Sequence, residues 1–395
     1  MQSTGILRPL KVLYIVNHAV PYGANVALLN ILDGVQGRGV MPMVVLGEKG
    51  VLCEELEKRD IRYEVVKHHF SAFPGLTSLR DYVLFLPKLF RMLITNQIAV
   101  KKVEEIAKRF GADIIHTNIG PSLIGFIVAR NLETPHVWHI REYQDLDFDI
   151  HAFPSKDNFN KKLRKRNNFP IAITRGIFSH FKMKENACVI YDGVLRKSQT
   201  QFSIIKNNYF LFVGRLEETK GIRKLIEAFI EFSKNNLDFE LRIAGHGNDD
   251  YILELKKMVS AANLSNRIHF LGFRKDVHDL MANAFALVVA SRYEGFGFIT
   301  VEAMFNGCLV IGNNTGGTKE ILEKEDLGIL YSGHNALVSA MNSVVANGIE
   351  CYFPMIKKAQ KQAVALYSKE HNAEAVFRLY TEIIESQGAF KECDC

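Results

Sequence analysis

Two glutamates mark the stretch of this 395-residue chain with the clearest potential for chemistry. They are Glu294 and Glu302, in SRYEGFGFITVEAM (291–304). The glycines between them permit a tight turn, and the apolar segment from Phe298 onward predicts a helix. Backbone amides at the start of that helix would form a favourable seat for an anion. A carboxylate accepts hydrogen bonds from a vicinal diol, so one glutamate on each side of a bound anion suggests two sugar rings that flank phosphates.

A simpler interpretation of the two glutamates stays open. Glu294 would then cap the helix, and Glu302 would be a solvated helix residue. The full string is more specific than either glutamate alone. The residues of this loop that we place at a binding site are Glu294, Gly295, Phe296, Gly297, Phe298 and Glu302.

A second pattern lies in FLFVGRLEETKGIRKL (210–225). Arg215 follows a predicted strand, and Lys220 stands beside a glycine at a predicted helix start. Two cations near a helix N-terminus could hold a diphosphate without a metal ion. Alternatively, both are ordinary surface charges, since Glu217 and Glu218 occupy the same loop.

Glycine turns follow several other predicted strands. AGHGND (244–249) contains Gly245, and RIHFLGF (267–273) ends on Gly272 and Phe273, where backbone groups could contact a nucleobase. With Gly214 these residues complete the predicted nucleotide-binding set. Each turn alone is a weak signal.

The first half carries a different set of polar residues. PYGAN (21–25) follows the first predicted strand and has a single glycine, so the GxGxxG fingerprint of dinucleotide-binding enzymes is missing there. HVWHIREYQD (136–145) places His139, Arg141 and Glu142 at a probable strand end. Isolated histidines are usually core residues, but we expect His139 to face the glutamate loop.

Short apolar runs alternate with helical periods along the whole chain, which predicts an α/β protein with parallel sheets. The pattern restarts at YFLFVGRL (209–216), and the polar stretch 194–208 separates the two parts. We therefore predict two Rossmann-like domains that face each other across a cleft. Their predicted bounds are 1–195 and 196–371, and a further helix is predicted near 372–390.

Composition sets limits on function. The net charge of +6 is mild, and no aromatic-basic interleaving indicates nucleic-acid binding. The six scattered cysteines argue against a disulfide framework or a metal site and favour a cytoplasmic protein. The apolar stretch 81–100 contains Pro87, Lys88 and Arg91, so we do not expect it to span a membrane. Stretches 79–93 and 161–166 are basic and could contact an anionic membrane.

These motifs, in this order, resemble the retaining GT-B glycosyltransferases of family 4, the glycosyl transferases group 1 class. The resemblance is strongest over 209–325. It implies that Glu294 contacts the donor sugar, that Glu302 contacts the ribose, and that Arg215 and Lys220 hold the diphosphate. It also implies that His139 lies near the anomeric carbon and that the terminal helix returns to the N-terminal domain.

The sequence departs from that family on the acceptor side. Tyr22-Gly23 stands where the family has paired glycines, and Asn118 stands where many members have a histidine. Acceptor identity therefore stays open. The acceptor-side residues that we single out are Tyr22, Asn25, Asn118 and Arg141, and Gly23 is assigned to the donor side.

The resulting prediction is a metal-independent, cytoplasmic enzyme without a cofactor. It would move a sugar from a UDP- or GDP-sugar to a hydroxyl acceptor, with retention, in cell-surface polysaccharide or lipid-linked glycan synthesis. Peripheral contact with the inner face of the membrane is compatible with this. The alternatives are a GT-B epimerase or inverting transferase, a non-catalytic sugar-nucleotide-binding protein, and an NAD-dependent dehydrogenase.

Overall fold

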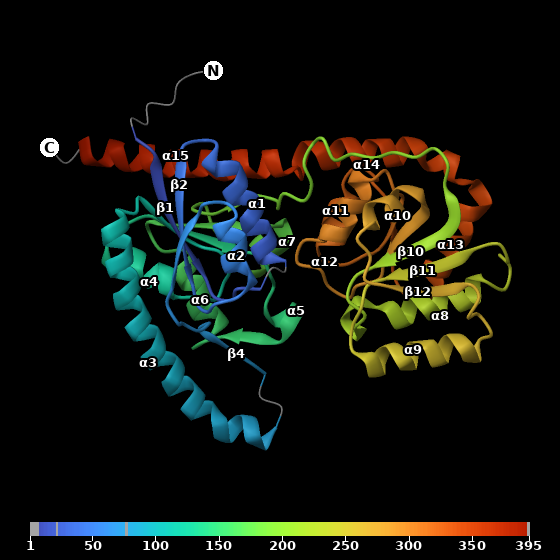
Figure 1. Cartoon of the computed structure of the whole chain (residues 1–395), viewed down its shortest axis with the longest axis horizontal. Coiled ribbons are helices and arrows are strands. Elements are labelled where there is room, and N and C mark those ends of the chain that lie inside the picture. The colour runs from blue at the N-terminus through green and yellow to red at the C-terminus, as the bar shows by residue number, and fades with distance from the viewer. Residues whose placement is uncertain (1–7, 21–22, 76–77, 393–395) are drawn as a thin grey trace. The chain divides into compact units, whose positions relative to one another are not determined.

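A computed structural model describes residues 8–20, 23–75 and 78–392. The chain divides into two compact units, which we call unit 1 and unit 2 (Figure 1). Unit 1 contains residues 1–193 and the returning segment 369–395, and unit 2 contains residues 194–368. The division falls two residues before the predicted start of the second domain, and the return to unit 1 begins three residues earlier than predicted.

Unit 1 is built on a parallel sheet of seven strands in the order β3-β2-β1-β5-β6-β8-β9. The first six of these positions follow the Rossmann order, in which the order of the strands reverses between β1 and β5. All side chains of HVWHI are buried, as expected for a parallel sheet covered on both faces. The strands are β1 (Leu10–Val16), β2 (Val40–Leu46), β3 (Arg62–Val65), β5 (Ile114–Thr117), β6 (His136–Ile140), β8 (Asn168–Ala172) and β9 (Cys188–Val189); β4 (Ala72–Pro74) and β7 (Ile150–Ala152) form a separate antiparallel pair.

Helices α1 and α15 pack against one another in unit 1, although they lie at opposite ends of the sequence (Figure 1). A Cβ added at Gly34 of α1 would lie 2.2 Å from the Cβ of Ala373 in α15, so this contact requires a glycine. The hydroxyl groups of Tyr14 and Tyr380 lie 3.0 Å apart beneath the contact. The helices of unit 1 are α1 (Ala24–Gln36), α2 (Val51–Glu57), α3 (Leu79–Phe110), α4 (Ile124–Asn131), α5 (Asp145–Phe148), α6 (Lys156–Leu163), α7 (Arg175–His180) and α15 (Lys369–Glu392).

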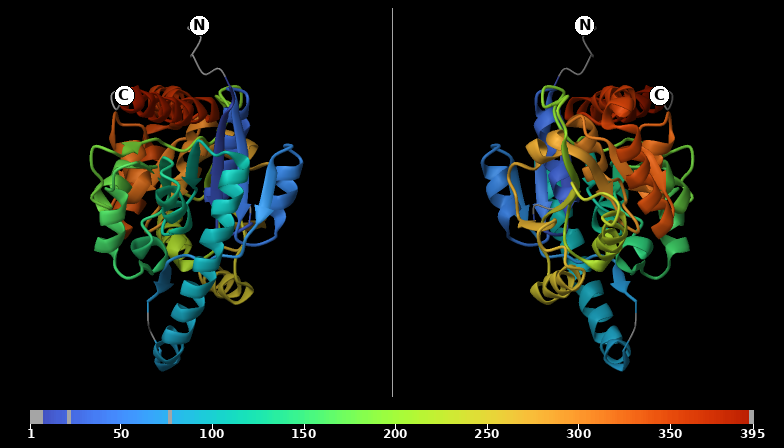
Figure 2. Two further views of the ribbon diagram at one scale, coloured as in Figure 1. Left: turned by 90° about the vertical axis from the view of Figure 1, so that its left-hand side faces the viewer. Right: turned by 90° about the vertical axis from the view of Figure 1, so that its right-hand side faces the viewer.

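Helix α3 is a single helix of 32 residues, and it contains the stretches 79–93 and 81–100 that were singled out from the sequence. A capping box formed by Ser78 and Asp81 starts it, and Gly111 ends it in the left-handed conformation, with φ of 69°. Pro87 lies inside the helix. The C-terminal part packs on the sheet, and the N-terminal part projects from it (Figure 2). Within the described residues, α3 is the one helix whose length and composition would allow it to cross a membrane.

Unit 2 repeats the architecture with six parallel strands in the full Rossmann order, β12-β11-β10-β13-β14-β15. The order of the strands in the sheet reverses between β10 and β13. The strands are β10 (Asn207–Val213), β11 (Glu240–Ala244), β12 (Ile268–Gly272), β13 (Ala284–Val289), β14 (Val310–Asn313) and β15 (Ile329–Tyr331); the helices are η1 (Glu218–Lys220), α8 (Ile222–Phe232), α9 (Asp249–Ala261), α10 (Val277–Asn283), α11 (Phe298–Phe305), α12 (Gly316–Glu323), α13 (His334–Asn347), η2 (Ile349–Tyr352) and α14 (Phe353–Leu366).

An aromatic cluster forms much of the core of unit 2. The rings of Phe210, Phe232, Phe239 and Phe285 pack together, with centroid distances between 5.0 and 6.1 Å. Edge-to-face contacts of this kind add to the free energy gained by burying apolar surface. The cluster fixes β10, β11 and β13 against α8, and it thereby fixes the loops at the carboxyl ends of those strands.

Candidate functional site

The two predicted motifs of unit 2 meet in one ion pair. Lys220 Nζ lies 2.8 Å from Glu294 Oε1, and Ser291 Oγ donates to the same oxygen at 2.7 Å. Lys220 follows β10 and Glu294 follows β13. Between these two strands the order of the strands in the sheet reverses. Ligands of open α/β sheets bind at this position, because the loops diverge there. The side chains of Lys220 and Glu294 are 24% and 19% exposed, so both can reach a ligand.

Backbone hydrogen bonds hold the Glu294 loop between its two neighbours. Arg292 N donates to Thr219 O at 3.0 Å, on the β10 side. On the β14 side, Gly317 N donates to Glu294 O at 2.8 Å, and Thr315 Oγ1 donates to Arg292 O at 2.8 Å. The carboxylate of Glu294 is therefore positioned before any ligand binds, which lowers the cost of binding.

Two glycines in this region are required by close backbone contact. A Cβ at Gly317 would lie 1.8 Å from Phe296 O, so no side chain fits where α12 meets the Glu294 loop. A Cβ at Gly245 would lie 1.9 Å from Gly214 O, and Gly245 also has a φ of 140°. Gly245 N donates to Gly272 O at 2.8 Å. The carboxyl ends of β10, β11 and β12 therefore meet through the three glycines that we predicted from the sequence.

Arg215 and Phe273 lie at the exposed side of the same sheet edge. The side chain of Arg215 is 66% exposed, and its Nη2 lies 3.1 Å from Glu217 Oε1. Phe273 is 70% exposed, and its ring centroid lies 6.1 Å from that of His246. An exposed aromatic ring is free to stack on a planar ligand. Lys220 itself belongs to η1, and α8 begins two residues later than the predicted helix start.

The side chain of Phe296 lies inside unit 2 rather than at its surface. It is buried, and its ring packs against Phe298 at 5.3 Å and against Tyr367 at 5.7 Å. The Phe296 ring is therefore removed from water, and its packing supports the Glu294 loop. Gly295 lies between Phe296 and Glu294. Helix α11 begins after Gly297, which has a φ of 101°, and Glu302 lies on it, half-buried.

His139 and Arg141, which were predicted at a strand end, are both buried within unit 1. Arg141 forms a short ion pair with Asp192, and its Nη2 lies 3.2 Å from His139 Nδ1. His139 Nε2 lies 3.9 Å from Asp192 Oδ1. Burial lowers the pKa of His139 well below 6.5, and the nearby charge of Arg141 lowers it further. His139 therefore stays neutral at pH 7 and belongs to a buried polar cluster with Arg141, Asp192 and His116.

The predicted acceptor-side residues are engaged with the backbone. Asn25 Nδ2 donates to His18 O and to Val20 O, both at 2.7 Å, and so holds the loop after β1. Asn118 Nδ2 donates to Ala24 O at 3.1 Å, and Arg141 Nε donates to Asn118 Oδ1 at 3.3 Å. Gly23 has a φ of 42° and open space around its Cα. Tyr22 lies outside the described residues.

Sequence analysis missed Asp192 and Ser291 as partners of predicted residues. Asp192 stands alone in the short segment YDG (191–193), which carries no motif. Only its burial beside Arg141 distinguishes it from other aspartates. Ser291 lay inside the quoted motif but carried no separate signal. Glu142 was placed at a strand end by the sequence analysis. Burial raises its pKa to about 7, and the charge of Asp147 raises the pKa further, whereas the charge of Arg141 lowers it.

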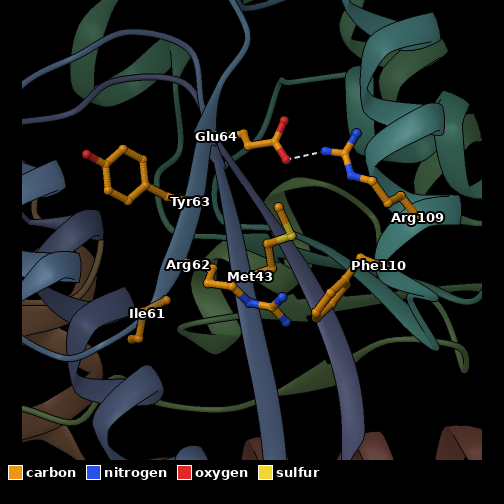
Figure 3. A pocket seen from close by; sticks show the side chains of 7 residues that line it. All are labelled: Met43, Ile61, Arg62, Tyr63, Glu64, Arg109 and Phe110. Carbon is orange, nitrogen blue, oxygen red and sulfur yellow. Dashed lines mark hydrogen bonds and ion pairs between the residues drawn. The ribbon is translucent and has the colours of Figure 1, made fainter.

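Unit 1 also contains a shallow pocket of about 420 Å³ at the β3 edge (Figure 3). Arg62, Glu64, Arg109 and Phe110 are among the residues that line it, and Arg109 pairs with Glu64. None of the predicted site residues lines this pocket. Among the residues that the structure describes, no three His, Cys, Asp or Glu side chains are grouped as metal ligands.

Comparison with solved structures defines the class as the GT-B glycosyltransferase fold. A structure of Anabaena HepE in complex with UDP superposes with a TM-score of 0.78 at 22% identity, over 94% of this chain and 100% of that one. A sucrose-phosphate synthase from Thermosynechococcus elongatus gives a TM-score of 0.72 at 16% identity, over 95% of this chain and 100% of that one. Further HepE structures contain UDP with glucose and UDP-glucose.

Residues 196–362 match the family described as glycosyl transferases group 1. An uncharacterized glycosyltransferase of Methanocaldococcus jannaschii is 28% identical over 65% of this chain and 69% of its own length. The N-acetyl-alpha-D-glucosaminyl L-malate synthase of Bacillus anthracis is 22% identical over 58% of this chain and 64% of its own length. A glycogen synthase of Thermodesulfovibrio yellowstonii is 28% identical over 46% of this chain, which spans only 36% of that enzyme.

Proposed function

We propose that this protein is a retaining glycosyltransferase that moves a sugar from a UDP- or GDP-sugar to a hydroxyl acceptor. Unit 2 would bind the donor. The observation that carries the proposal is the pairing of Lys220 with Glu294 at the point between β10 and β13 where the strand order reverses. A cation and a carboxylate at that position offer one group to a diphosphate and one to sugar hydroxyls.

The donor would be held by groups that already lie together. Its diphosphate would replace Glu294 as the partner of Lys220, and the exposed guanidinium of Arg215 would turn from Glu217 to a second phosphate oxygen. Glu294, held by Ser291, would then accept hydrogen bonds from sugar hydroxyls. The nucleobase would stack on Phe273, beside the three glycines, and Glu302 would contact the ribose. HepE, solved with UDP-glucose, supports a UDP-sugar as the first donor to test.

In the proposed reaction, the bond between the anomeric carbon and the diphosphate oxygen breaks. The acceptor oxygen forms its new bond on the same face of the sugar, and the acceptor proton passes to the departing phosphate. Lys220 and Arg215 would stabilise the negative charge that develops on the diphosphate. Stabilisation of this kind is often the largest single contribution to catalysis, and two cations can supply it without a metal ion.

Unit 1 would bind the acceptor, a hydroxyl of a glycan or lipid-linked glycan in cell-surface polysaccharide synthesis. The buried cluster of His139, Arg141 and Asp192 would position the loops after β1 and β5, since Arg141 donates to Asn118 and Asn118 donates to Ala24. The protein would act in the cytoplasm, with peripheral contact to the membrane.

A panel of UDP- and GDP-sugars tests the proposal. Donor binding is expected to raise the unfolding temperature, because a ligand at a hundredfold excess over its Kd stabilises the folded state by about 2.7 kcal/mol. Hydrolysis of the bound donor in EDTA would test metal independence. NMR of the released or transferred sugar at early times would report the anomeric configuration, which is expected to be retained.

Two variants make the test specific. Lys220→Ala is expected to abolish the donor-dependent thermal shift, whereas Lys224→Ala, which changes an exposed lysine on the following helix α8, is expected to leave it unchanged. Inversion at the anomeric carbon would favour an inverting enzyme. Binding without turnover for every donor and acceptor would favour a non-catalytic binding protein, and indifference to all nucleotide sugars would refute the proposal.

A further inference from the structure

Helix α3 carries a continuous apolar face that its own unit leaves exposed. Eight large apolar side chains on it are between 46% and 83% exposed: Leu79, Tyr82, Val83, Leu86, Phe90, Leu93, Ile94 and Ile98. Their spacing of three and four residues places them on one side of the helix. Exposed apolar patches of this size in soluble domains usually mark an interaction surface.

Contacts on the opposite side fix the orientation of this face. The ring of Phe85 packs against Phe73 with centroids 5.0 Å apart, and the Asn96 side chain exchanges two hydrogen bonds with the backbone of His69. Met92 is buried on the same side, and Ala99 begins the part that packs in the core. These contacts place the apolar face on the side of the helix that is turned away from unit 1. Figure 2 shows the part of the helix that projects from the sheet.

The charges on α3 indicate what this face binds. Between residues 79 and 103 the helix has five cations, and its single carboxylate, Asp81, belongs to the capping box. In the part of the chain that the structure describes, no carboxylate forms an ion pair with Arg80, Lys88 or Arg91. Arg80, Lys88 and Arg91 are exposed. Helical spacing places Arg80 and Arg91 at the border of the apolar face and Lys88 on the opposite side of the helix.

We propose that α3 is a membrane-docking helix that lies in the plane of an anionic lipid surface. The apolar face would enter the boundary between headgroups and acyl chains, and Arg80 and Arg91 at its border would contact anionic headgroups. A second copy of this chain is a poorer partner, because a symmetric contact would place these cations against one another. The proposal does not depend on the donor chemistry of unit 2.

The same residues argue against a spanning helix. A span needs about 20 residues, and a span starting at Leu79 would place Lys88 and Arg91 near its centre, where charge is costly. Extending it toward Phe110 would remove Val103, Ile106 and Phe110 from the core of unit 1. A helix that is anchored at one end and apolar on its outer face fits an interfacial position.

Vesicle co-sedimentation of the full chain tests the proposal. Wild-type protein is expected to bind vesicles of phosphatidylcholine with phosphatidylglycerol, to bind pure phosphatidylcholine less, and to dissociate as salt is raised. The variant L86Q/F90Q is expected to bind at least about tenfold more weakly, because two exposed apolar side chains are lost from the interface. The variant R80Q/R91Q is expected to lose about fivefold per charge and to lose its preference for the anionic lipid.

A matched control lies on α9 of unit 2, where Leu253 and Lys257 are also exposed. The variant L253Q/K257Q is expected to bind vesicles like wild type, and all variants are expected to unfold at the wild-type temperature. Failure of the folded wild type to bind either vesicle would overturn the proposal. So would resistance of the bound protein to alkaline carbonate, which indicates a span, or a dimer that L86Q/F90Q dissociates without any vesicle binding.

Discussion

The two units share one topology but place their polar residues differently. In unit 2 the charged side chains predicted from sequence remain partly open to solvent, as Arg215 and the Lys220–Glu294 pair illustrate. In unit 1 His139 lies on β6, and Arg141 and Asp192 follow β6 and β9; all three are buried. The shared topology therefore supports a partly exposed pair after β10 and β13 in unit 2 and an internal polar cluster beside β6 and β9 in unit 1.

This difference separates two uses of charge. A partly exposed ion pair keeps much of its hydration, so its formation has a small desolvation free energy. Such a pair can exchange one partner for a ligand. A buried pair has lost its hydration, so each member depends on the other for its stability. Sequence motifs alone do not distinguish the two cases, because both place a basic residue just after a buried strand.

The largest expected effect comes from opening the buried pair. Asp192→Asn leaves the Arg141 guanidinium buried without a counter-charge, and we expect a loss of about 3–5 kcal/mol in the free energy of unfolding. Urea denaturation measures it. The matched substitution Asp276→Asn removes the partner of Arg274 in an exposed pair of unit 2 and should cost less than about 1 kcal/mol. Equal costs for the two substitutions would remove the distinction between the units.

The second effect concerns the open pair. Lys220→Ala should lower kcat/KM of the proposed transfer by about 10²- to 10³-fold, the range seen when one preorganised electrostatic group is removed. Because the Lys220–Glu294 pair is partly exposed, the free energy of unfolding should change by less than about 1 kcal/mol. Steady-state kinetics and urea denaturation measure the two quantities. A variant that keeps its activity but loses much stability would assign Lys220 a structural role.

Acid should destabilise unit 1 selectively. Burial lowers the pKa of His136 to about 3, and it lowers the pKa values of His116 and His139 well below 6.5. The unfolded chain binds these protons first, so the stability present above pH 6.5 is lost as pH falls, by about 1.4 kcal/mol per pH unit for each histidine. Glu142 acts in the opposite sense: with its pKa raised to about 7, its stabilising contribution is lost as pH rises from about 4.5 to 7.

Calorimetry of two variants between pH 5 and 6.5 separates these contributions. His136→Gln should flatten the dependence of unit 1 stability on pH by about 1.4 kcal/mol per unit, and Glu142→Gln should steepen it. A pH dependence that neither variant alters would contradict the assigned burial effects.

The smallest effect concerns the exposed ring at the edge of unit 2. Phe273→Ala should weaken binding of the nucleotide portion of the donor by about fivefold, or about 1 kcal/mol, the low end for stacking of a base on an aromatic side chain. Leu237→Ala, another exposed apolar residue of unit 2, serves as the control. Isothermal titration with UDP measures both, and equal affinities would exclude stacking on Phe273.

Unit 2 was largely predictable because its signals are local. Strands β10 and β12 agree within three residues with the runs 209–216 and 267–273 that were quoted from the sequence, since each is a short apolar run that ends in a glycine turn. The sequence predicted a glycine turn at Gly245. The close contact with Gly214 O, which is what requires a glycine there, depends on strand pairing and could not be predicted. Strand β15 was missed because Ile329–Tyr331 is too short to show periodicity.

Unit 1 was harder to predict because its polar residues gain their meaning from distant partners. Nothing around His139 in the sequence indicates that Asp192 lies beside it or that Tyr380 covers the neighbouring His116. The same holds for α3, which continues through Pro87 as one helix with tertiary contacts on both sides of that residue.

The return of α15 to unit 1 sets an order for synthesis of the chain. Unit 2 is one uninterrupted segment, so it can fold as soon as residue 368 has left the ribosome. Unit 1 must wait for α15, because Tyr380 supplies a hydroxyl partner to both Tyr14 and His116 and Ala373 fills the space above Gly34. The portion translated first is thus the portion completed last, and for most of translation its sheet lacks the covering helix that keeps its apolar surface from other chains.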